Sequence, residues 1–321
     1  MLRAPDLLGR RLLFFTGKGG VGKSTVTAAM ALLAAERGKR VLVVEVDGKS
    51  SIADRFETAE LSFTPTGVYP NVFAMAMDTE ASLREYLKLN LRVPIVGGLG
   101  PLAKALDFVA TAAPGVKEIL TIGKICWEVR ESLEGRAAWD LVVVDASATG
   151  HVVSQLGAPD AIRDVVAVGP VRSQTDWMSA LLADPSITAL NIVATAEELP
   201  VAETIDLVSR VREQLDVSLG AVVVNQVLPA LFTRSDEVVF ERLCGPDARK
   251  VLGIAAGGDV GIVLEAARLA ESLRATRAMH LERLRETVDL PMLFLPYLFA
   301  RSHGLRETRL VADALRAELG L

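Results

Sequence analysis

A glycine-rich loop near the start of the chain carries the clearest chemistry in the sequence. It reads Gly-Lys-Gly-Gly-Val-Gly-Lys-Ser from Gly17 to Ser24, after the apolar run Leu12–Thr16 and before an alanine-rich segment. This Gly-x-x-x-x-Gly-Lys-Ser pattern between a strand and a helix is typical of a loop that binds the phosphates of a nucleotide. We therefore expect ATP and Mg²⁺ to be the ligands of this chain.

Each residue of the loop has an expected role in this site. Glycines let backbone N–H groups converge on phosphate oxygens, and the start of the following helix adds positive potential. Lys23 is expected to reach the β- and γ-phosphates, and the Ser24 hydroxyl to bind Mg²⁺. The alternative is a glycine-rich turn without a ligand. The predicted nucleotide-binding residues of this segment are Gly17, Gly19, Gly20, Val21, Gly22, Lys23, Ser24 and Thr25.

The second residue of the loop, Lys18, narrows the class of ATPase. The opening Gly-Lys-Gly-Gly resembles the deviant-Walker ATPases, a class that includes MinD, ParA, the nitrogenase iron protein and ArsA. In that class the early lysine reaches across a dimer to the partner's phosphates. The resemblance implies a catalytic role for Lys18, which would neutralise developing charge, and a second subunit that is identical or related. The alternative is a lysine that is only solvated on the loop.

The segment Val43–Phe56 resembles the first switch of the ArsA and tail-anchored-protein targeting ATPase family. That switch begins Asp-Pro-Ala-His and continues to Asp-x-Phe, so Asp47 falls on the family's water-orienting aspartate, and Asp54 and Phe56 also match. The resemblance implies that Asp47 is catalytic. Because Gly48-Lys49-Ser50 replaces Pro-Ala-His, we expect a low rate of hydrolysis. The alternative for Asp47 is an ordinary turn residue at a strand end.

The segment Asp145–His151 resembles the second switch of the same family. It reads Asp-Ala-Ser-Ala-Thr-Gly-His, where the family has Asp-Thr-Ala-Pro-Thr-Gly-His. A carboxylate at the end of an apolar strand is where an aspartate that faces Mg²⁺ belongs in such ATPases. Asp145 and Ser24 are therefore the predicted metal-binding residues. Ala146 and Ala148 replace the family's Thr and Pro, which weakens the expected coupling of this loop to the γ-phosphate. The alternative for Asp145 is a helix cap.

Two later segments carry a predicted adenine site. Ala221–Gln226 and the run from Leu295 to Leu298 resemble a late strand of the family and the loop that closes over the base. By that resemblance Asn225 reads the adenine, since an amide can both donate and accept hydrogen bonds, and Pro296 and Leu298 contact the base. A strand-end asparagine and a plain turn are the alternatives.

The elements that must position these residues alternate along the chain. Short apolar runs alternate with helical patterns, which predicts an α/β fold: a P-loop NTPase with a mostly parallel β-sheet covered by helices. Helices are expected over Lys23–Arg37, Val201–Gln214 and Glu265–Glu286, and the C-terminus is expected to pack as a helix. The predicted strands are Leu12–Thr16, Val41–Val46, Val72–Met77, Leu141–Asp145, Val165–Gly169, Leu190–Ala194, Ala221–Gln226 and Met292–Leu295.

Residues 79–135 lack a strand pattern, and we predict that they form an inserted helical subdomain within a single ATPase domain over residues 1–321. Helices are expected over Glu80–Leu91, Leu102–Ala112 and Val116–Leu133, with breaks at prolines and glycines. The family builds its groove for hydrophobic clients at this position, so the resemblance implies a client or partner surface. The alternative is that these apolar faces pack on the domain itself or on the other subunit.

The composition limits other classes of function. The chain has 321 residues, of which 50% are hydrophobic, and a net charge of −5, which supports a real core and gives no basic surface for nucleic acid. Its two cysteines, Cys126 and Cys244, form no C-x-x-C pair. We therefore expect neither the zinc that joins the two subunits of the eukaryotic targeting ATPases nor the cluster of thiolates with which arsenite pump subunits bind metalloid. The few cysteines also predict a reducing, cytoplasmic location. No stretch reaches the roughly 20 apolar residues of a membrane span.

Three functions stay open from the sequence. The first is a dimeric ATPase whose nucleotide state opens and closes a helical surface for a hydrophobic protein client or a peripheral membrane contact. The second is a nucleotide-binding subunit of a heterodimer that hydrolyses little or no ATP, which the altered switches favour. The third is a MinD- or ParA-like positioning ATPase, although the C-terminus is not a basic amphipathic helix and the net charge promises no DNA surface.

Overall fold

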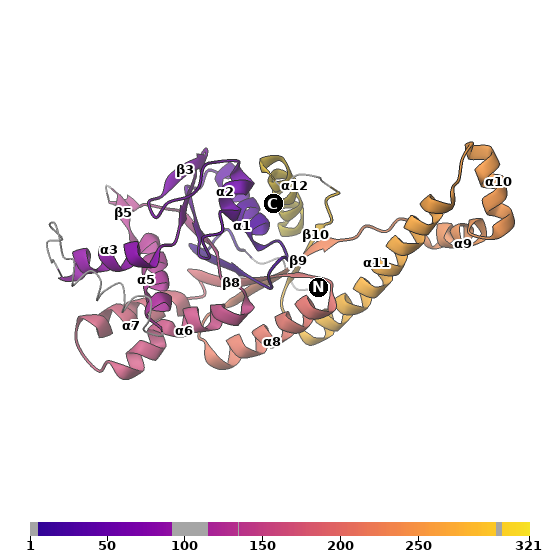
Figure 1. Cartoon of the computed structure of the whole chain (residues 1–321). Coiled ribbons are helices and arrows are strands. Elements are labelled where there is room, and N and C mark those ends of the chain that lie inside the picture. The colour runs from indigo at the N-terminus through magenta and orange to yellow at the C-terminus, as the bar shows by residue number, and fades with distance from the viewer. Residues whose placement is uncertain (1–5, 92–114, 134, 300–303) are drawn as a thin grey trace.

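The computed structural model describes residues 6–91, 115–133, 135–299 and 304–321. Its centre is an eight-stranded sheet with the order β10-β9-β8-β1-β7-β2-β4-β3 (Figure 1). All neighbouring strands are parallel except β3 and β4 at one edge, so the predicted α/β class with a mostly parallel sheet is confirmed. The strands are β1 (Leu12–Thr16), β2 (Val41–Glu45), β3 (Thr66–Tyr69), β4 (Val72–Ala76), β7 (Leu141–Asp145), β8 (Thr188–Thr195), β9 (Leu219–Val227) and β10 (Met292–Pro296).

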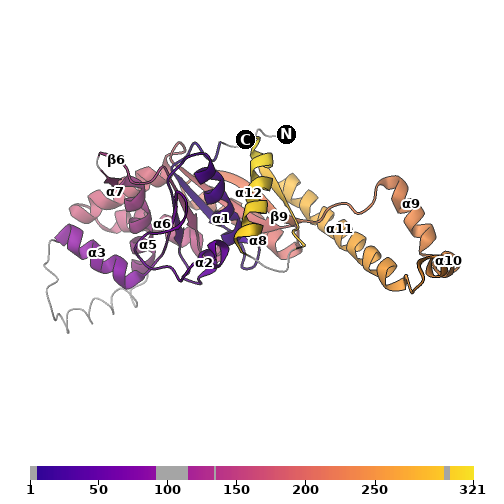
Figure 2. The same ribbon diagram turned by 90° about the horizontal axis from the view of Figure 1, so that it is seen from above.

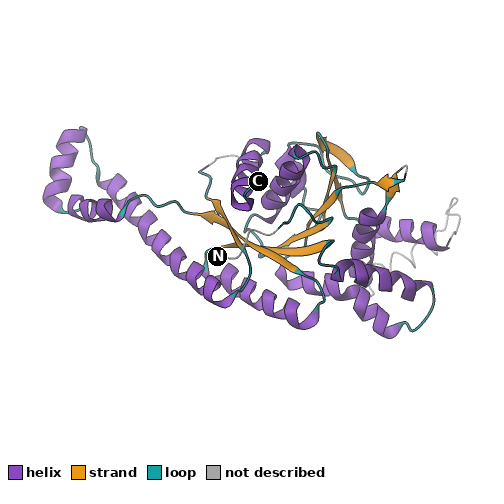
Figure 3. Cartoon of the chain, turned by 180° about the vertical axis from the view of Figure 1, so that it is seen from behind, coloured by secondary structure: helices purple, strands orange, loops and turns teal. Residues whose placement is uncertain are grey.

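The sheet is covered on both faces, which explains why its central strands are apolar throughout instead of alternating. In β1, Leu13 and Phe15 belong to one core and Leu12 and Phe14 to the other. Figure 3 shows helices on either side of the sheet. The first core includes residues of α1 (Lys23–Glu36), α2 (Ser51–Phe56) and α12 (Leu305–Leu319); the second includes residues of α5 (Val116–Arg130), α6 (Thr149–Val165), α7 (Pro170–Ala183), α8 (Glu198–Gln214) and α11 (Gly261–Thr287).

Four helices gather at one end of the molecule, where α3 (Thr79–Leu91) lies beside α5, α6 and α7 (Figures 1 and 2). A nearly buried lysine joins two of them, since Lys124 of α5 pairs with Glu85 of α3 and Glu128 of α5, each over 2.8 Å. The predicted helix Leu102–Ala112 lies outside the described residues. The boundary of a helical subdomain at residues 79–135 stays a prediction, because α6 and α7 follow it in the chain and pack on α5.

The other end of the molecule carries a helical arm, which we define as α9 (Arg234–Leu243), α10 (Pro246–Ala256) and α11. Figures 1 and 2 show this arm extending away from the sheet. Only Leu284, near its C-terminal end, is buried in α11, and α10 has no buried residue. None of the described helices combines the length and the apolar character that a membrane crossing requires.

One predicted strand is wrong. Val165–Gly169 is instead the last residue of α6 and the loop that leads into α7, and Val165 and Val168 are 84% and 83% exposed. A short apolar run cannot by itself distinguish a buried strand from the end of a helix. The helix predicted over Val116–Leu133 ends at Arg130, after which β5 (Ser132–Leu133) pairs with β6 (Arg136–Ala137). The short edge strand β3 was not predicted.

Candidate active site

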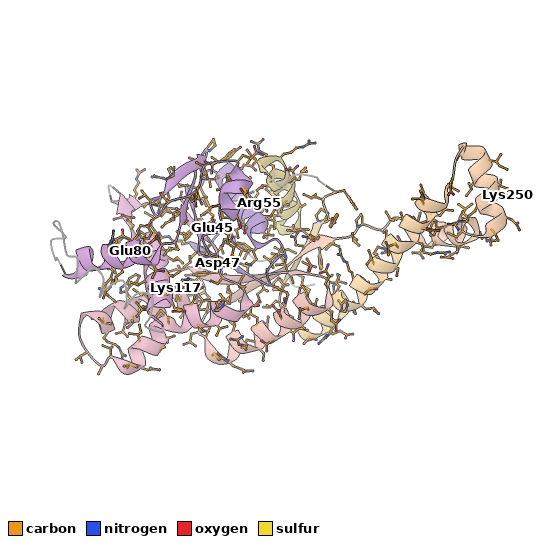
Figure 4. The ribbon with its side chains drawn as sticks, in the orientation of Figure 1. Glu45, Asp47, Arg55, Glu80, Lys117 and Lys250 are labelled. Carbon is orange, nitrogen blue, oxygen red and sulfur yellow. The ribbon has the colours of Figure 1, made fainter. Side chains whose placement is uncertain are left out.

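A polar cavity of about 260 Å³ lies at the carboxyl end of β2 and β7, against the loop after β1. Parallel strands bring these three segments together because their carboxyl ends meet at one edge of the sheet. Figure 4 shows Glu45, Asp47 and Arg55 in this part of the molecule, far from Lys250 on the arm. The cavity is lined by Gly19, Gly20, Gly22, Lys23, Ser24, Thr25, Glu45, Asp47, Lys49, Ser51, Arg55, Asp145 and Ala146.

Two glycines give the loop before α1 its shape. Gly17 has a φ of 155°, and a Cβ there would lie 2.1 Å from the Val193 carbonyl oxygen. Gly22 has a φ of 92°, and a Cβ there would lie 2.3 Å from Asn225 Nδ2. Left-handed backbone and close packing both demand glycine at these positions. The loop can therefore turn tightly enough to direct backbone N–H groups into the cavity at the start of α1.

Ser24 and Asp145 form the closest polar pair in the cavity. Ser24 Oγ donates a hydrogen bond to Asp145 Oδ2 over 2.6 Å, and Asp145 is only 6% exposed. Burial raises the pKa of Asp145 to about 6, against the lowering effects of the Ser24 hydrogen bond and the Lys23 charge. The other carboxylate oxygen, Oδ1, is buried without a hydrogen-bond partner among the described residues.

Glu45, which no sequence motif had singled out, lies beside Asp145 on the neighbouring strand. Its Oε1 accepts hydrogen bonds from the backbone N–H groups of Lys49 and Ser51 over 3.1 and 2.8 Å, whereas its Oε2 is buried without a partner among the described residues. Burial raises the pKa of Glu45. A charged residue at the end of the apolar run Val41–Glu45 was the signal that could have revealed it.

These oxygens fit a divalent cation. The half-buried Ser24 hydroxyl, the Asp145 carboxylate that accepts its hydrogen bond and the carboxylate oxygens without partners are hard oxygen donors of the kind that Mg²⁺ prefers. Nucleotide phosphates can complete such a site. The residues that would hold Mg²⁺ are Ser24 and Asp145, which stay a prediction, and Glu45 lies in register with Asp145 on the neighbouring strand. Burial of unpaired carboxylate oxygens is costly, so a cation here would offset an existing cost.

The two predicted switch segments touch each other through a serine. Ser147 Oγ donates a hydrogen bond to Asp47 Oδ1 over 3.2 Å, and Ser147 is held in turn because its carbonyl oxygen accepts a 2.7 Å hydrogen bond from Thr16. Lys49 Nζ lies 3.8 Å from Asp47 Oδ2. Asp47 itself is exposed and lines the cavity, so a water molecule can reach its carboxylate.

Lys18 does not line the cavity although it belongs to the same loop. Its ammonium forms an ion pair with Glu203 of α8, and Glu203 Oε2 accepts a hydrogen bond of 2.8 Å from Thr149 at the start of α6. Sequence reasoning missed Glu203, which lies in the segment Val201–Gln214 that was expected only to be a helix. No local pattern could have identified it as a partner of Lys18, which lies 185 residues away in the chain.

The predicted adenine residues lie on another side of the loop. Asn225, at the end of β9, is buried, and its Nδ2 donates a 2.9 Å hydrogen bond to the carbonyl oxygen of Val21. Pro296 is exposed at the end of the neighbouring strand β10, and Leu298 packs against the core beside α1. Asn225 thus supports the phosphate loop directly. Contact of these three residues with adenine stays a prediction, and none of them lines the cavity, nor do Gly17 and Val21.

Comparisons with known proteins agree with this geometry. A family described as anion-transporting ATPase matches residues 10–169 and 165–242 of the chain. ATPase BagA of Mycobacterium tuberculosis is 36% identical over 70% of this chain and 67% of its own length. The ATPase ASNA1 homolog of Entamoeba histolytica is 26% identical over 68% of this chain and 76% of its own length. An arsenical pump-driving ATPase of Escherichia coli is 28% identical over 70% of this chain but only 40% of that longer protein. A chain with this loop, this sheet and these relatives belongs to the anion-transporting ATPase family and is an ArsA-like ATPase.

Proposed function

We propose that this ATPase binds ATP with Mg²⁺ in the cavity beside the phosphate loop and works as a dimer with a second identical or related subunit in the cytoplasm. The observation that carries the proposal is the pair formed by Ser24 and Asp145, because it presents an unpartnered buried carboxylate oxygen next to the loop. A buried carboxylate of this kind is costly unless a cation or a proton neutralises its charge.

The residues of the chain divide the reaction between them. Backbone N–H groups of the loop and the Lys23 ammonium hold the phosphates, and Asp47 accepts a hydrogen bond from the attacking water. The water oxygen forms a bond to the γ-phosphorus as the bond to the oxygen of the β-phosphate breaks, which yields ADP and phosphate. Bound Mg²⁺ supplies positive charge that offsets the charge on the phosphate oxygens.

The proposed dimer would add a cation that the chain does not place in its own cavity. Lys18 belongs to the phosphate loop, yet its partly exposed side chain lies outside the cavity lining. A lysine in that place can act on the nucleotide of a neighbouring subunit and neutralise charge in trans. This reading matches the deviant-Walker resemblance of the loop.

We also propose that nucleotide state is coupled to a helical surface for a hydrophobic client. The helix α6 begins at Thr149 in the second switch, and Ile162 near its other end lines an apolar cavity of about 340 Å³. That cavity lies between α3, α5, α6 and α7, and its lining includes Trp127, Trp177 and Met178. A helix that starts at the phosphate site and ends at an apolar cavity, with Pro159 inside it as a point where it can bend, provides a path for coupling. The two candidates for what this surface binds are a hydrophobic client peptide and the surface of a membrane.

The decisive experiment is the release of phosphate from ATP by the purified chain. Wild-type protein with Mg²⁺ is expected to release phosphate faster than the Lys23→Ala and Asp47→Asn variants, because they remove a phosphate contact and the water-orienting group. Asp216→Asn is the matched control, since Asp216 is exposed and lies before the amino end of β9, whereas the cavity lies at the carboxyl ends of the strands. Equal rates for wild type and Asp47→Asn would contradict hydrolysis by the isolated subunit.

A second candidate function is a subunit that binds nucleotide but hydrolyses little of it. The observation that favours it is the ion pair between Lys49 and Asp47, because a cation 3.8 Å from the carboxylate competes with water for it. This function predicts that the isolated chain binds ATP but does not hydrolyse it. It also predicts that hydrolysis begins when a related subunit, purified from an extract of the native cells, is added. Nucleotide binding is measured by isothermal titration.

A further inference from the structure

We infer that Glu203 is a positioning residue that holds Lys18 outside the chain's own phosphate cavity until a nucleotide phosphate competes for the lysine. The inference rests on the proposed function, because it assumes that Lys18 acts on phosphate. Glu203 belongs to α8, and no motif of the phosphate site includes it. It nevertheless contacts both the phosphate loop and the start of α6.

The Glu203 carboxylate uses its two oxygens for two different segments. Oε1 forms the ion pair with Lys18 Nζ, and Oε2 accepts the 2.8 Å hydrogen bond from Thr149 Oγ1. These contacts lower the pKa of Glu203, mainly because the Lys18 ammonium stabilises the ionised form. We call the three side chains the Lys18–Glu203–Thr149 bridge.

The ion pair in the bridge is strong enough to position the Lys18 side chain and weak enough to break when a stronger partner is present. Lys18 and Glu203 side chains are each 31% exposed, so water screens the ion pair, and such a pair is worth a factor of about two to five in an equilibrium constant. A triphosphate carries several negative charges, so it attracts the ammonium more strongly than one carboxylate does. The lysine can therefore exchange its partner when a nucleotide is presented to it.

The exchange has a second consequence at the start of α6. When Lys18 leaves, Glu203 keeps only its hydrogen bond from Thr149, and its negative charge is no longer neutralised. Two residues before Thr149, Ser147 contacts Asp47 of the first switch. Glu203 thus lies between the lysine of the phosphate loop and the helix whose other end lines the apolar cavity. A negative charge beside a helix N-terminus is favourable, so loss of the ammonium is expected to strengthen the interaction of Glu203 with the start of α6.

The ion pair is tested first without any nucleotide. Wild-type chain, Glu203→Gln and Glu198→Gln are labelled briefly with an amine-reactive reagent, and the labelling of Lys18 is measured by mass spectrometry relative to exposed Lys250 on α10 (Figure 4). Glu203→Gln is expected to raise the relative labelling of Lys18 at least twofold, because the ion pair no longer shields the amine. Glu198→Gln removes a charge from the same helix and is expected to match wild type. Equal labelling of Lys18 in all three proteins would overturn the inference.

The effect on function is tested by a double-mutant cycle. Phosphate release is measured at several protein concentrations for wild type, Glu203→Gln, Lys18→Ala and the double variant. Glu203→Gln is expected to raise turnover about two- to fivefold at the lowest protein concentrations, where association limits the rate, because Lys18 no longer has to leave the carboxylate. The double variant is expected to equal Lys18→Ala.

Each other outcome has a distinct meaning. A Glu203→Gln effect that persists without Lys18, or turnover at or below wild type in Glu203→Gln, would overturn the positioning role. If Lys18→Ala alone turns over ATP as fast as wild type, the proposed role of Lys18 fails, and the functional consequence of the bridge fails with it. The labelling experiment still reports in that case whether Glu203 holds the lysine, so the two failures are distinguishable.

Discussion

Ser24 and Asp145 are 121 residues apart in the chain, yet their side chains meet at 2.6 Å in the cavity. The contact depends on β1 and β7 being parallel neighbours, with Phe15 in register with Asp145. The serine is the last residue of the phosphate loop and the second residue of α1, so the pair links that loop to the second switch.

Removal of the serine hydroxyl is expected to weaken the Mg²⁺-dependent part of nucleotide binding. In Ser24→Ala the affinity for ATP in the presence of Mg²⁺ should fall about tenfold, because one metal ligand and one hydrogen bond to a charged group are lost. Affinity for ATP in EDTA should change little. Titration calorimetry under both conditions measures the difference, with Ser51→Ala as a control that removes another hydroxyl from the cavity lining. Equal losses with and without Mg²⁺ would argue against a metal role for Ser24.

Asp145 is expected to make the stability of the nucleotide-free chain fall as pH rises. Its pKa is raised from 3.8 to about 6 in the folded chain, so between these values the folded state binds more protons than the unfolded state. The stability linked to its protonated form is therefore present below pH 4 and is lost as pH rises through 6. The loss is on the order of 3 kcal/mol.

The asparagine variant isolates this effect from other groups, including Glu45. Asp145→Asn keeps an oxygen that can accept the Ser24 hydrogen bond but cannot ionise. In EDTA, its free energy of unfolding relative to wild type should increase between pH 4 and pH 7, as measured by urea denaturation. A difference that stays constant across this range would show that Asp145 does not titrate there.

Gly22→Ala is expected to damage the phosphate loop through two separate effects. A left-handed φ of 92° costs an alanine on the order of 1 kcal/mol, and the new Cβ would lie 2.3 Å from Asn225 Nδ2. Nucleotide binding should be lost and thermal stability lowered. Adding Asn225→Ala should restore part of the stability relative to Gly22→Ala, because it removes the clash, although the backbone strain stays and the hydrogen bond to Val21 is lost. If Gly22→Ala lowers stability as much in the Asn225→Ala background as in wild type, the clash with Asn225 is not the cause.

Lys124 is expected to be essential for the packing of α3 on α5. Its side chain is 9% exposed, and it neutralises Glu128, which is 3% exposed and also accepts a 2.8 Å hydrogen bond from Trp139 Nε1. Lys124→Ala leaves a buried carboxylate without its cation, which should destabilise the chain by about 3 kcal/mol. Lys124→Ala with Glu128→Gln should be more stable than Lys124→Ala alone, as measured by chemical denaturation. Lys117→Ala on the same helix is the control for loss of a lysine, since Lys117 is exposed and takes part in no ion pair named above (Figure 4).

The sequence by itself determined the features that depend on adjacent residues. Gly17 to Ser24 are contiguous, and the conformation of their backbone follows from glycines at fixed spacing, so the loop, the strand before it and the helix after it could all be predicted. Asp47 and Asp145 could be predicted near the loop because parallel strands end at a common edge. The strand predicted at Val165–Gly169 was wrong because an apolar run does not show which strand would pair with it, and in the described part of the chain no strand pairs with these residues.

Only the tertiary structure decided which side chains meet across the chain. Glu45 is close to Asp145 because β2 pairs with β7 in register, and Arg55 lines the cavity because α2 folds back over it. The direction of Lys18 depends on Glu203, which the packing of α8 brings to the loop from 185 residues away. Side-chain contacts of this kind depend on the position of whole elements. A local pattern can therefore predict a phosphate loop, but it cannot tell where the lysine of that loop points.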